Sequence, residues 1–132
     1  MTKVMSSYVV ADQIANDFLS LDDSVLISEK AWRMEGSKMF IEQGKRVSVL
    51  DLLKGIIIQS GNDATVALAE YVGGTEDGFV DLMNSYAASM GLSNTLFQNS
   101  TGLPDGNHFS SAKDLAIMLS LIHISEPTRP SQ

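Results

Sequence analysis

The segment from Val49 to Ile58 constrains the fold more than any other part of the sequence. Apart from Asp51, Lys54 and Gly55 its side chains are aliphatic, so a helix here is apolar nearly all round. Such a helix is expected to be buried on several sides, which requires neighbouring elements around it. Ser48 precedes it as a candidate N-cap, and Asp51 three residues later completes a capping-box pattern.

The part of the chain before this segment contains one predicted helix, one strand and a loop. The helix runs from Lys3 to Phe18, and apolar residues at helical spacing form its predicted buried face: Val4, Tyr8, Ala11, Ile14, Ala15 and Phe18. Val25–Ile27 is typical of a short strand. Residues 36–44 are loop-like, and their predicted anchors into the core are Met39, Phe40 and Ile41.

Two further helices follow the apolar segment. Asn62 or Asp63 is predicted to cap the first, which stops at Gly73 and the glycine after it. Thr75 caps the second, which stops at Gly91. After a polar loop, a last helix begins at Ser110 or Ser111 and runs through Leu115, Met118 and Leu119. The chain is therefore predicted to be helix-rich, with a few short strands.

Composition excludes several classes of function. With 132 residues the chain is long enough for one domain with one core. A formal charge of -7 and scattered basic residues argue against nucleic acid and anionic membrane surfaces as partners. The absence of cysteine excludes disulfides, thiolate nucleophiles and zinc–thiolate sites. No apolar run approaches the ~20 residues that a membrane span needs, and no signal segment is present.

Three short sequence patterns contain side chains that could take part in catalysis or binding. Met1-Thr2-Lys3 places a lysine at the start of the first helix, and Gln59-Ser60-Gly61-Asn62-Asp63-Ala64 lies between two helices. The third consists of Thr101-Gly102-Leu103 followed by His108-Phe109-Ser110-Ser111-Ala112-Lys113-Asp114-Leu115-Ala116. Each pattern alone is weak, since Ser-Gly-Asn before an apolar run is an ordinary turn and cap. Their occurrence together, in this order, gives them their significance.

As a set they resemble the serine D-alanyl-D-alanine carboxypeptidases, the low-molecular-weight penicillin-binding proteins of peptidase family S11. Residues 1–3 resemble the end of S-[LM]-T-K, residues 60–62 the S-G-N form of S-x-N, and residues 108–116 the stretch H-Y-S-[ST]-A-x-D-L-A. The resemblance covers residues 1–118. It implies an α-rich fragment, a helical subdomain plus short strands, of an α/β fold like that of the β-lactamases and transpeptidases.

The resemblance also implies a mechanism. In this family a serine one helical turn before the lysine attacks the carbonyl of the penultimate D-alanine of a peptidoglycan stem peptide. Lys3 would take its proton, for which burial or cationic neighbours must lower the lysine pKa. Ser60 would pass the proton to the leaving D-alanine, and Asn62 would hold Lys3 and the substrate by hydrogen bonds. His108 is interpreted as a loop side chain.

The same resemblance predicts the surroundings of the complete protein. It implies no cofactor and no metal, and β-lactams as inhibitors that form a slow acyl-enzyme. It places the protein in the periplasm, or on the outer face of the inner membrane, and leaves a membrane anchor open. Two family elements are absent from residues 1–132: the nucleophilic serine, expected directly before Met1, and the K-T-G strand, expected well after residue 118. The chain as given is therefore predicted to be inactive.

The last part of the chain is interpreted separately. Residues 119–129 resemble the translation of a sequencing-library adapter, so residues 1–118 are predicted to be the partial catalytic domain and 119–132 a non-native tail. The alternative is a last helix that continues and ends before Pro127. Two other functions stay open: a relative of the class A β-lactamases, which Ser60-Gly61-Asn62 disfavours, and a non-catalytic helical interaction module.

Overall fold

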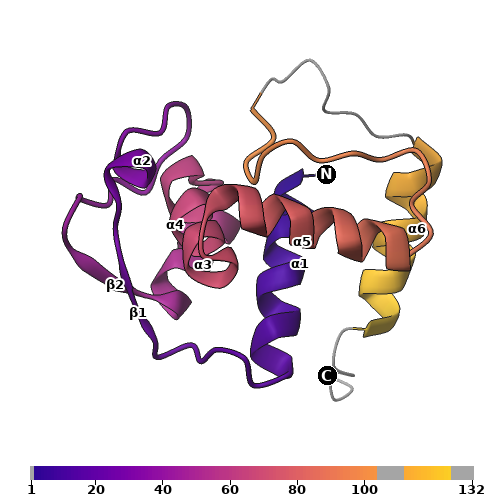
Figure 1. Ribbon diagram of the computed structural model, residues 1–132, viewed down its shortest axis with the longest axis horizontal. Coiled ribbons are helices and arrows are strands. Elements are labelled where there is room, and N and C mark those ends of the chain that lie inside the picture. Colours follow the sequence, from indigo (N-terminus) through magenta and orange to yellow (C-terminus); the bar gives the residue numbers. More distant parts are fainter. Residues whose placement is uncertain (1, 104–111, 126–132) are drawn as a thin grey trace.

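The computed structural model describes residues 2–103 and 112–125 of the chain. Its elements, in chain order, are α1 (Thr2–Ala15), β1 (Ser24–Leu26), α2 (Glu29–Trp32), β2 (Arg46–Ser48), α3 (Val49–Gln59), α4 (Asn62–Gly73), α5 (Glu76–Ser89) and α6 (Ala112–Ser125). Helices dominate the described residues, and two short strands lie at one end of the molecule (Figure 1). This confirms the predicted α-rich architecture.

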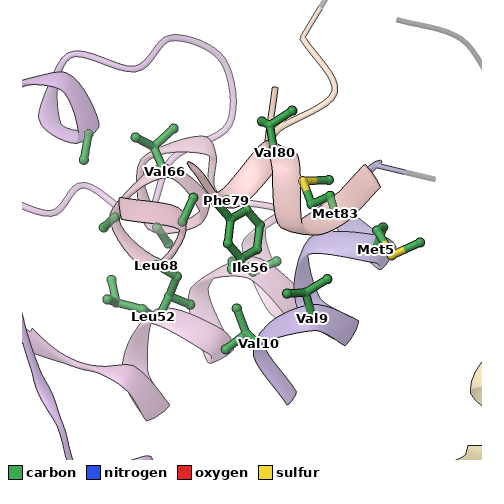
Figure 2. Packing of buried hydrophobic residues seen from close by; sticks show 14 of the residues in the cluster. Met5, Val9, Val10, Leu52, Ile56, Val66, Leu68, Phe79, Val80 and Met83 are labelled. Carbon is green, nitrogen blue, oxygen red and sulfur yellow. The ribbon is translucent and has the colours of Figure 1, made fainter. Parts of the chain in front are cut away.

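The core lies where α1, α3, α4 and α5 pack together. Phe79 of α5 is buried at its centre. Figure 2 shows its ring directly above Ile56 of α3, with Leu52 of α3 and Val9 of α1 to either side. The first eight residues of α4, Asn62 to Ala69, are all buried, which makes α4 the central helix. Small side chains such as those of Ala64 and Ala67 allow its neighbours to approach closely.

The two strands form an antiparallel pair that leads directly into α3. Ser24 pairs with Ser48, Val25 with Val47, and Leu26 with Arg46. Ser48 is both the last residue of β2 and the N-cap of α3, where its hydroxyl accepts a hydrogen bond from the Asp51 N–H at 3.1 Å. The pairing of β2 with β1 therefore fixes where α3 begins. The first strand and the cap were predicted from the sequence, whereas β2 and the short helix α2 were not.

The predicted cap of α5 and the predicted ends of α4 and α5 are confirmed, whereas the predicted cap of α4 at Asn62 or Asp63 is wrong, because its N-cap is Gly61. Thr75 caps α5 by accepting a hydrogen bond from the Gly78 N–H at 3.0 Å. Gly74, at φ +81°, ends α4, and Gly91, at φ +78°, follows the end of α5. These are left-handed conformations, which glycine adopts without the penalty that a Cβ atom brings. Caps and stops depend on local chemistry, and this is why the sequence reveals them.

The predicted buried face of α1 is largely wrong, although Tyr8 and Ile14 are partly buried and pack against the core. The residues that α1 buries are Thr2, Met5, Ser6, Val9 and Val10. Val4 is exposed, the helix ends at Ala15, and Phe18 beyond it is 74% exposed. The buried face contains the apolar side chains of Met5, Val9 and Val10. On the same face the buried Ser6 hydroxyl donates to the Ser100 carbonyl oxygen at 2.6 Å. A polar residue with a distant partner does not appear in a hydropathy pattern.

Two other predictions of burial are corrected. The helix α3 buries one side only, through Val49, Leu52, Gly55 and Ile56, and it leaves Ile57 and Ile58 mostly exposed. Of the three predicted loop anchors, Ile41 is buried and Met39 is partly buried, but Phe40 is 81% exposed at φ +63°. A left-handed backbone at residue 40 turns that side chain away from the core.

The last helix extends past the predicted end of native sequence. α6 runs from Ala112 to Ser125, its Met118 is fully buried, and Leu119 is exposed. The division at residue 118 stays a prediction, because a foreign segment in frame with a helix can prolong it. No helix within residues 2–103 and 112–125 has the length and hydropathy needed to cross a membrane.

Candidate active site

The Ser60-Gly61-Asn62 turn joins α3 to α4 and has an unusual backbone. Ser60 is the C-cap of α3 in the left-handed conformation, at φ +50° and ψ +38°. Its N–H donates to the Ile56 carbonyl oxygen at 2.9 Å, and the residue is exposed. A non-glycine residue in this region carries a strain of about 1 kcal/mol or more. The turn therefore presents the serine hydroxyl at the surface on a backbone fixed by the helix end.

Gly61 is closely packed, and a side chain at this position would require its neighbours to shift. A Cβ atom at this position would lie 3.0 Å from Asp63 Oδ1 and 3.2 Å from the Met39 main-chain nitrogen. Its carbonyl oxygen accepts from the Thr65 hydroxyl at 2.8 Å, and its own N–H donates to Gly55. The turn is therefore held by both helices that it connects.

Asn62, the first residue of α4, is 3% exposed. It donates hydrogen bonds to the loop between α2 and β2. Its main-chain N–H donates to the Ser37 carbonyl oxygen at 2.7 Å. Its side-chain Nδ2 donates to the Glu35 carbonyl oxygen at 2.7 Å. The other end of the amide, Oδ1, is buried without a hydrogen-bond partner in the described part of the chain. A buried acceptor without a donor is costly unless a ligand or a side-chain movement supplies one.

Asp63 has a role that the sequence did not reveal. It was a candidate cap, yet the N-cap of α4 is Gly61, which makes no side-chain cap bond. The buried Asp63 carboxylate instead accepts from the main-chain nitrogens of Met39 at 3.0 Å and Ile41 at 3.2 Å. It also accepts from the next residue, Ala64, at 2.8 Å. Asp63 therefore fastens the loop that lies against the Ser60 turn.

Lys3 lies against the same turn. Its ammonium nitrogen donates to the Ser60 carbonyl oxygen at 2.7 Å. Partial burial lowers the pKa of Lys3 below its ordinary value of 10.5, because the charged form loses hydration. The structure thus brings Lys3 and Ser60 together. The Asn62 side chain, predicted to hold Lys3, bonds to Glu35 instead.

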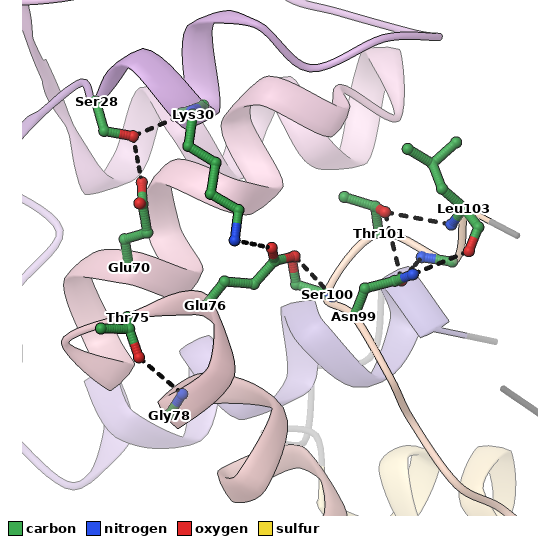
Figure 3. Close-up of polar contacts among 12 residues, drawn as sticks. Ser28, Lys30, Glu70, Thr75, Glu76, Gly78, Asn99, Ser100, Thr101 and Leu103 are labelled. Carbon is green, nitrogen blue, oxygen red and sulfur yellow. Dashed lines mark hydrogen bonds and ion pairs between the residues drawn. The ribbon is translucent and has the colours of Figure 1, made fainter. Parts of the chain in front are cut away.

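The third sequence pattern also meets the start of α1. A Cβ atom at Gly102, which has φ +86°, would lie 3.2 Å from Thr2 Cβ. Ser100 just before it is bound on both sides: its N–H and hydroxyl donate to Glu76 at 3.1 and 2.7 Å, and its carbonyl oxygen accepts from Ser6. Figure 3 shows this strap of residues 99–103 beside Glu76. Residues 104–111, with His108, lie outside the described residues.

The Glu76 carboxylate links the strap of residues 99–103 to the helix α2. It pairs with the Lys30 ammonium of α2 at 2.7 Å (Figure 3). Burial acts to raise the pKa of Glu76, but hydrogen bonds from Lys30 and Ser100 outweigh it and lower that pKa below 4.5. Within residues 2–103 and 112–125, no group of three or more histidine, aspartate or glutamate side chains is placed to hold a metal ion.

Comparison with known proteins now decides the family. Residues 1–130 match the peptidase S11 family, D-alanyl-D-alanine carboxypeptidase. The chain belongs to this family. It is 47% identical to the D-alanyl-D-alanine carboxypeptidase DacC of Escherichia coli K12 over 130 residues, which is 93% of this chain and 32% of that protein. It is 46% identical to DacF of Bacillus subtilis over 118 residues, 89% of this chain and 30% of that protein.

Solved structures of this family have the same fold. The carboxypeptidase DacD of Francisella tularensis matches with a TM-score of 0.89 and 48% identity, over 94% of this chain and 30% of that one. Penicillin-binding protein 6B of Escherichia coli matches with a TM-score of 0.90 and 42% identity, over 96% and 42% respectively. The described helices and strands therefore correspond to one part of the penicillin-binding fold. The chain spans about a third of the length of the curated relatives.

Proposed function

We propose that residues 1–118 are part of the catalytic domain of a serine D-alanyl-D-alanine carboxypeptidase and supply its proton-transferring side chains. The observation that carries this proposal is the contact between Lys3 and the Ser60 turn, with Nζ 2.7 Å from the Ser60 carbonyl oxygen. Lys3, Ser60 on its turn and the buried side-chain amide of Asn62 lie close together. This is the set that the family's chemistry uses.

The proposed reaction begins with a serine one helical turn before Lys3. That serine attacks the carbonyl of the penultimate D-alanine of a peptidoglycan stem peptide, and the neutral Lys3 amine takes its proton. Partial burial favours this neutral form, since it lowers the pKa of Lys3. Ser60 passes the proton to the nitrogen of the departing D-alanine. Water then hydrolyses the acyl-enzyme and regenerates the serine.

The proposal includes the partners and the compartment. Peptides ending in D-Ala-D-Ala are the substrates, and β-lactams act as inhibitors because they acylate the same serine and leave slowly. The site of action is the periplasm or the outer face of the inner membrane, where the cell wall is built. Residues 1–132 alone are expected to form no acyl-enzyme, because no serine within them precedes Lys3 by one turn. Residues 119–132 take no part in the proposal.

The test uses the full-length product of the gene, whose reading frame is established by sequencing the DNA on both sides of codons 1–132. Wild-type protein is expected to release D-alanine from a peptide ending in D-Ala-D-Ala and to be labelled by fluorescent penicillin. Lys3→Met should lower the labelling rate by about 10²-fold or more, whereas Lys45→Met, at an exposed position, should not change it. Absence of both activities from the wild-type protein would reject the proposal in favour of a non-catalytic module.

A further inference from the structure

The two ends of the Asn62 side-chain amide face different environments. Nδ2 donates to the Glu35 carbonyl oxygen at 2.7 Å, while Oδ1 is buried and lacks a partner among the described residues. A main-chain carbonyl only accepts hydrogen bonds, so the amide end that faces it must be the NH₂ group. Rotation of the amide by half a turn would set two acceptors against each other. The Glu35 carbonyl therefore fixes the orientation of the Asn62 side-chain amide, with Nδ2 toward Glu35 and Oδ1 away from it.

The approach of Glu35 depends on the next residue. Gly36 has φ +81°, and a Cβ atom there would lie 2.6 Å from Asn62 Nδ2. That separation is shorter than any stable contact between carbon and nitrogen, so any side chain at residue 36 must displace the Asn62 amide. The following residue, Ser37, accepts the Asn62 main-chain N–H at 2.7 Å. Residues 35–37 thus contact Asn62 at both its backbone and its side chain.

The chain that follows these residues is fastened to the same helix. Asp63 accepts from the main-chain nitrogens of Met39 and Ile41, so residues 35–41 are tied to the first turn of α4 at several points. A segment held in this way cannot retreat easily from an added methyl group at residue 36. The displacement would fall on the Asn62 amide.

We propose that Gly36 is a positioning residue of the site, acting through Asn62. Because residue 36 has no side chain, the Glu35 carbonyl reaches Nδ2 and holds the amide with Oδ1 presented as an acceptor for an N–H donor in the site. This inference rests on the proposed function, in which Asn62 holds Lys3 and the substrate. It identifies the loop between α2 and β2 as the element that sets the orientation of that amide.

The chain contains a matched control for this proposal. Gly44 has φ +80°, almost the same as Gly36, but a Cβ atom there would meet nothing within 4 Å. Gly36→Ala and Gly44→Ala therefore impose the same backbone strain, and only the first pushes on Asn62. In the full-length protein, Gly36→Ala is expected to slow acylation by fluorescent penicillin about tenfold or more. Gly44→Ala should leave the rate unchanged, and equal rates for the two variants would overturn the proposal.

A double-mutant cycle separates positioning from general damage to the fold. If Gly36 acts through the Asn62 amide, the effect of Gly36→Ala on the acylation rate should disappear when Asn62 is already alanine. Thermal unfolding of the same variants shows whether each remains folded. Effects of Gly36→Ala and Asn62→Ala that simply multiply in the acylation rate would contradict the proposal.

A measurement without any activity distinguishes this inference from the proposed function. In the isotopically labelled full-length protein, the Asn62 NH₂ protons should exchange slowly and show scalar coupling across the hydrogen bond to the Glu35 carbonyl carbon. Gly36→Ala should abolish both signals, and Gly44→Ala should retain them. If the wild-type Asn62 NH₂ exchanged as fast as that of the exposed Gln43, the inference would fail even if the enzyme were active.

Discussion

The ammonium nitrogen of Lys3 lies 2.7 Å from the carbonyl oxygen of Ser60, 57 positions later in the chain. This bond joins the start of α1 to the end of α3, so the lysine does not move freely in solvent. A neutral amine keeps two N–H groups, so Lys3 can still donate to Ser60 after losing a proton. The lone pair released by deprotonation is then available to accept a proton from another group.

The first prediction concerns pH. Partial burial lowers the pKa of Lys3 from 10.5, so a greater fraction is neutral at a given pH than for a free lysine. In the full-length protein, the rate of acylation by fluorescent penicillin should rise with pH along a limb whose midpoint lies below 10.5. Lys45→Met should show the same profile. A midpoint at or above the ordinary value would show that Lys3 is not the base.

The second prediction concerns acid stability. Because the pKa of Glu76 is lowered in the folded state, its ionised form stabilises the fold above the ordinary value of 4.5, and this contribution is lost as pH falls below it. Glu76→Gln should reduce the free energy of unfolding at neutral pH by about 1–3 kcal/mol. The same substitution should also make the free energy of unfolding fall less steeply as the pH is lowered. Denaturant titrations from neutral pH to well below 4.5 measure both effects.

The control for this prediction is Glu29, which pairs with Arg33 at 2.7 Å on the exposed surface of α2. Both partners are largely in water, so Glu29→Gln should change the free energy of unfolding by about 0.5 kcal/mol or less. Equal losses for the two glutamine variants would show that burial of Glu76 contributes nothing.

The third prediction compares two adjacent isoleucines of α3. Ile56 is 4% exposed in the core beside Phe79, whereas Ile57 is 72% exposed. Ile56→Ala should cost about 2–5 kcal/mol because it removes buried methyl groups and leaves a cavity. Ile57→Ala should cost about 0.5 kcal/mol or less. Chemical unfolding of the two variants measures the difference, and similar losses would place the buried side of α3 elsewhere.

The fourth prediction concerns the loop against the Ser60 turn. Asp63→Asn replaces one acceptor oxygen by an NH₂ group, which cannot accept from the main chain of Met39 or Ile41. The free energy of unfolding should fall by about 1–3 kcal/mol. The loss should be accompanied by faster amide exchange at Met39 and Ile41.

Asp51→Asn serves as its control, because Asp51 also lies in the first turn of a helix but is exposed. It shares with Asp63 the favourable interaction of a carboxylate with a helix N-terminus. Unlike Asp51, Asp63 is buried and accepts hydrogen bonds from the main chain of the loop. If the two asparagine variants lost the same stability, the helix terminus would explain the effect and the loop contacts would not.

Local chemistry was enough to predict many parts of this fold. Ser48 and Thr75 act as caps because their hydroxyls accept from N–H groups three residues later. Gly74 and Gly91 lie at helix ends because glycine adopts a positive φ without strain. The family patterns likewise pointed to Lys3 and Ser60, which the structure brings together.

The errors came from contacts between distant residues. The burial of Ser6 depends on Ser100, the role of Asp63 depends on Met39 and Ile41, and the exposure of Ile57 depends on which neighbours α3 meets. The hydropathy pattern of one helix predicts which apolar side chains it could bury. It does not predict the partner of a polar side chain. The Glu35 contact of Asn62 belongs to the same class, since a main-chain carbonyl has no signature in the sequence.

The bond between Ser6 and Ser100 has a consequence for the order of events during synthesis. The two residues are 94 positions apart, so α1 leaves the ribosome long before the strap that fastens it exists. Before Ser100 is translated, α1 can make its apolar contacts and its bond from Lys3 to Ser60, but the Ser6 hydroxyl still lacks its partner. Although α1 is translated well before Ser100, it is secured by this bond only afterwards. A nascent chain that ends before Ser100 would contain α1 without that bond.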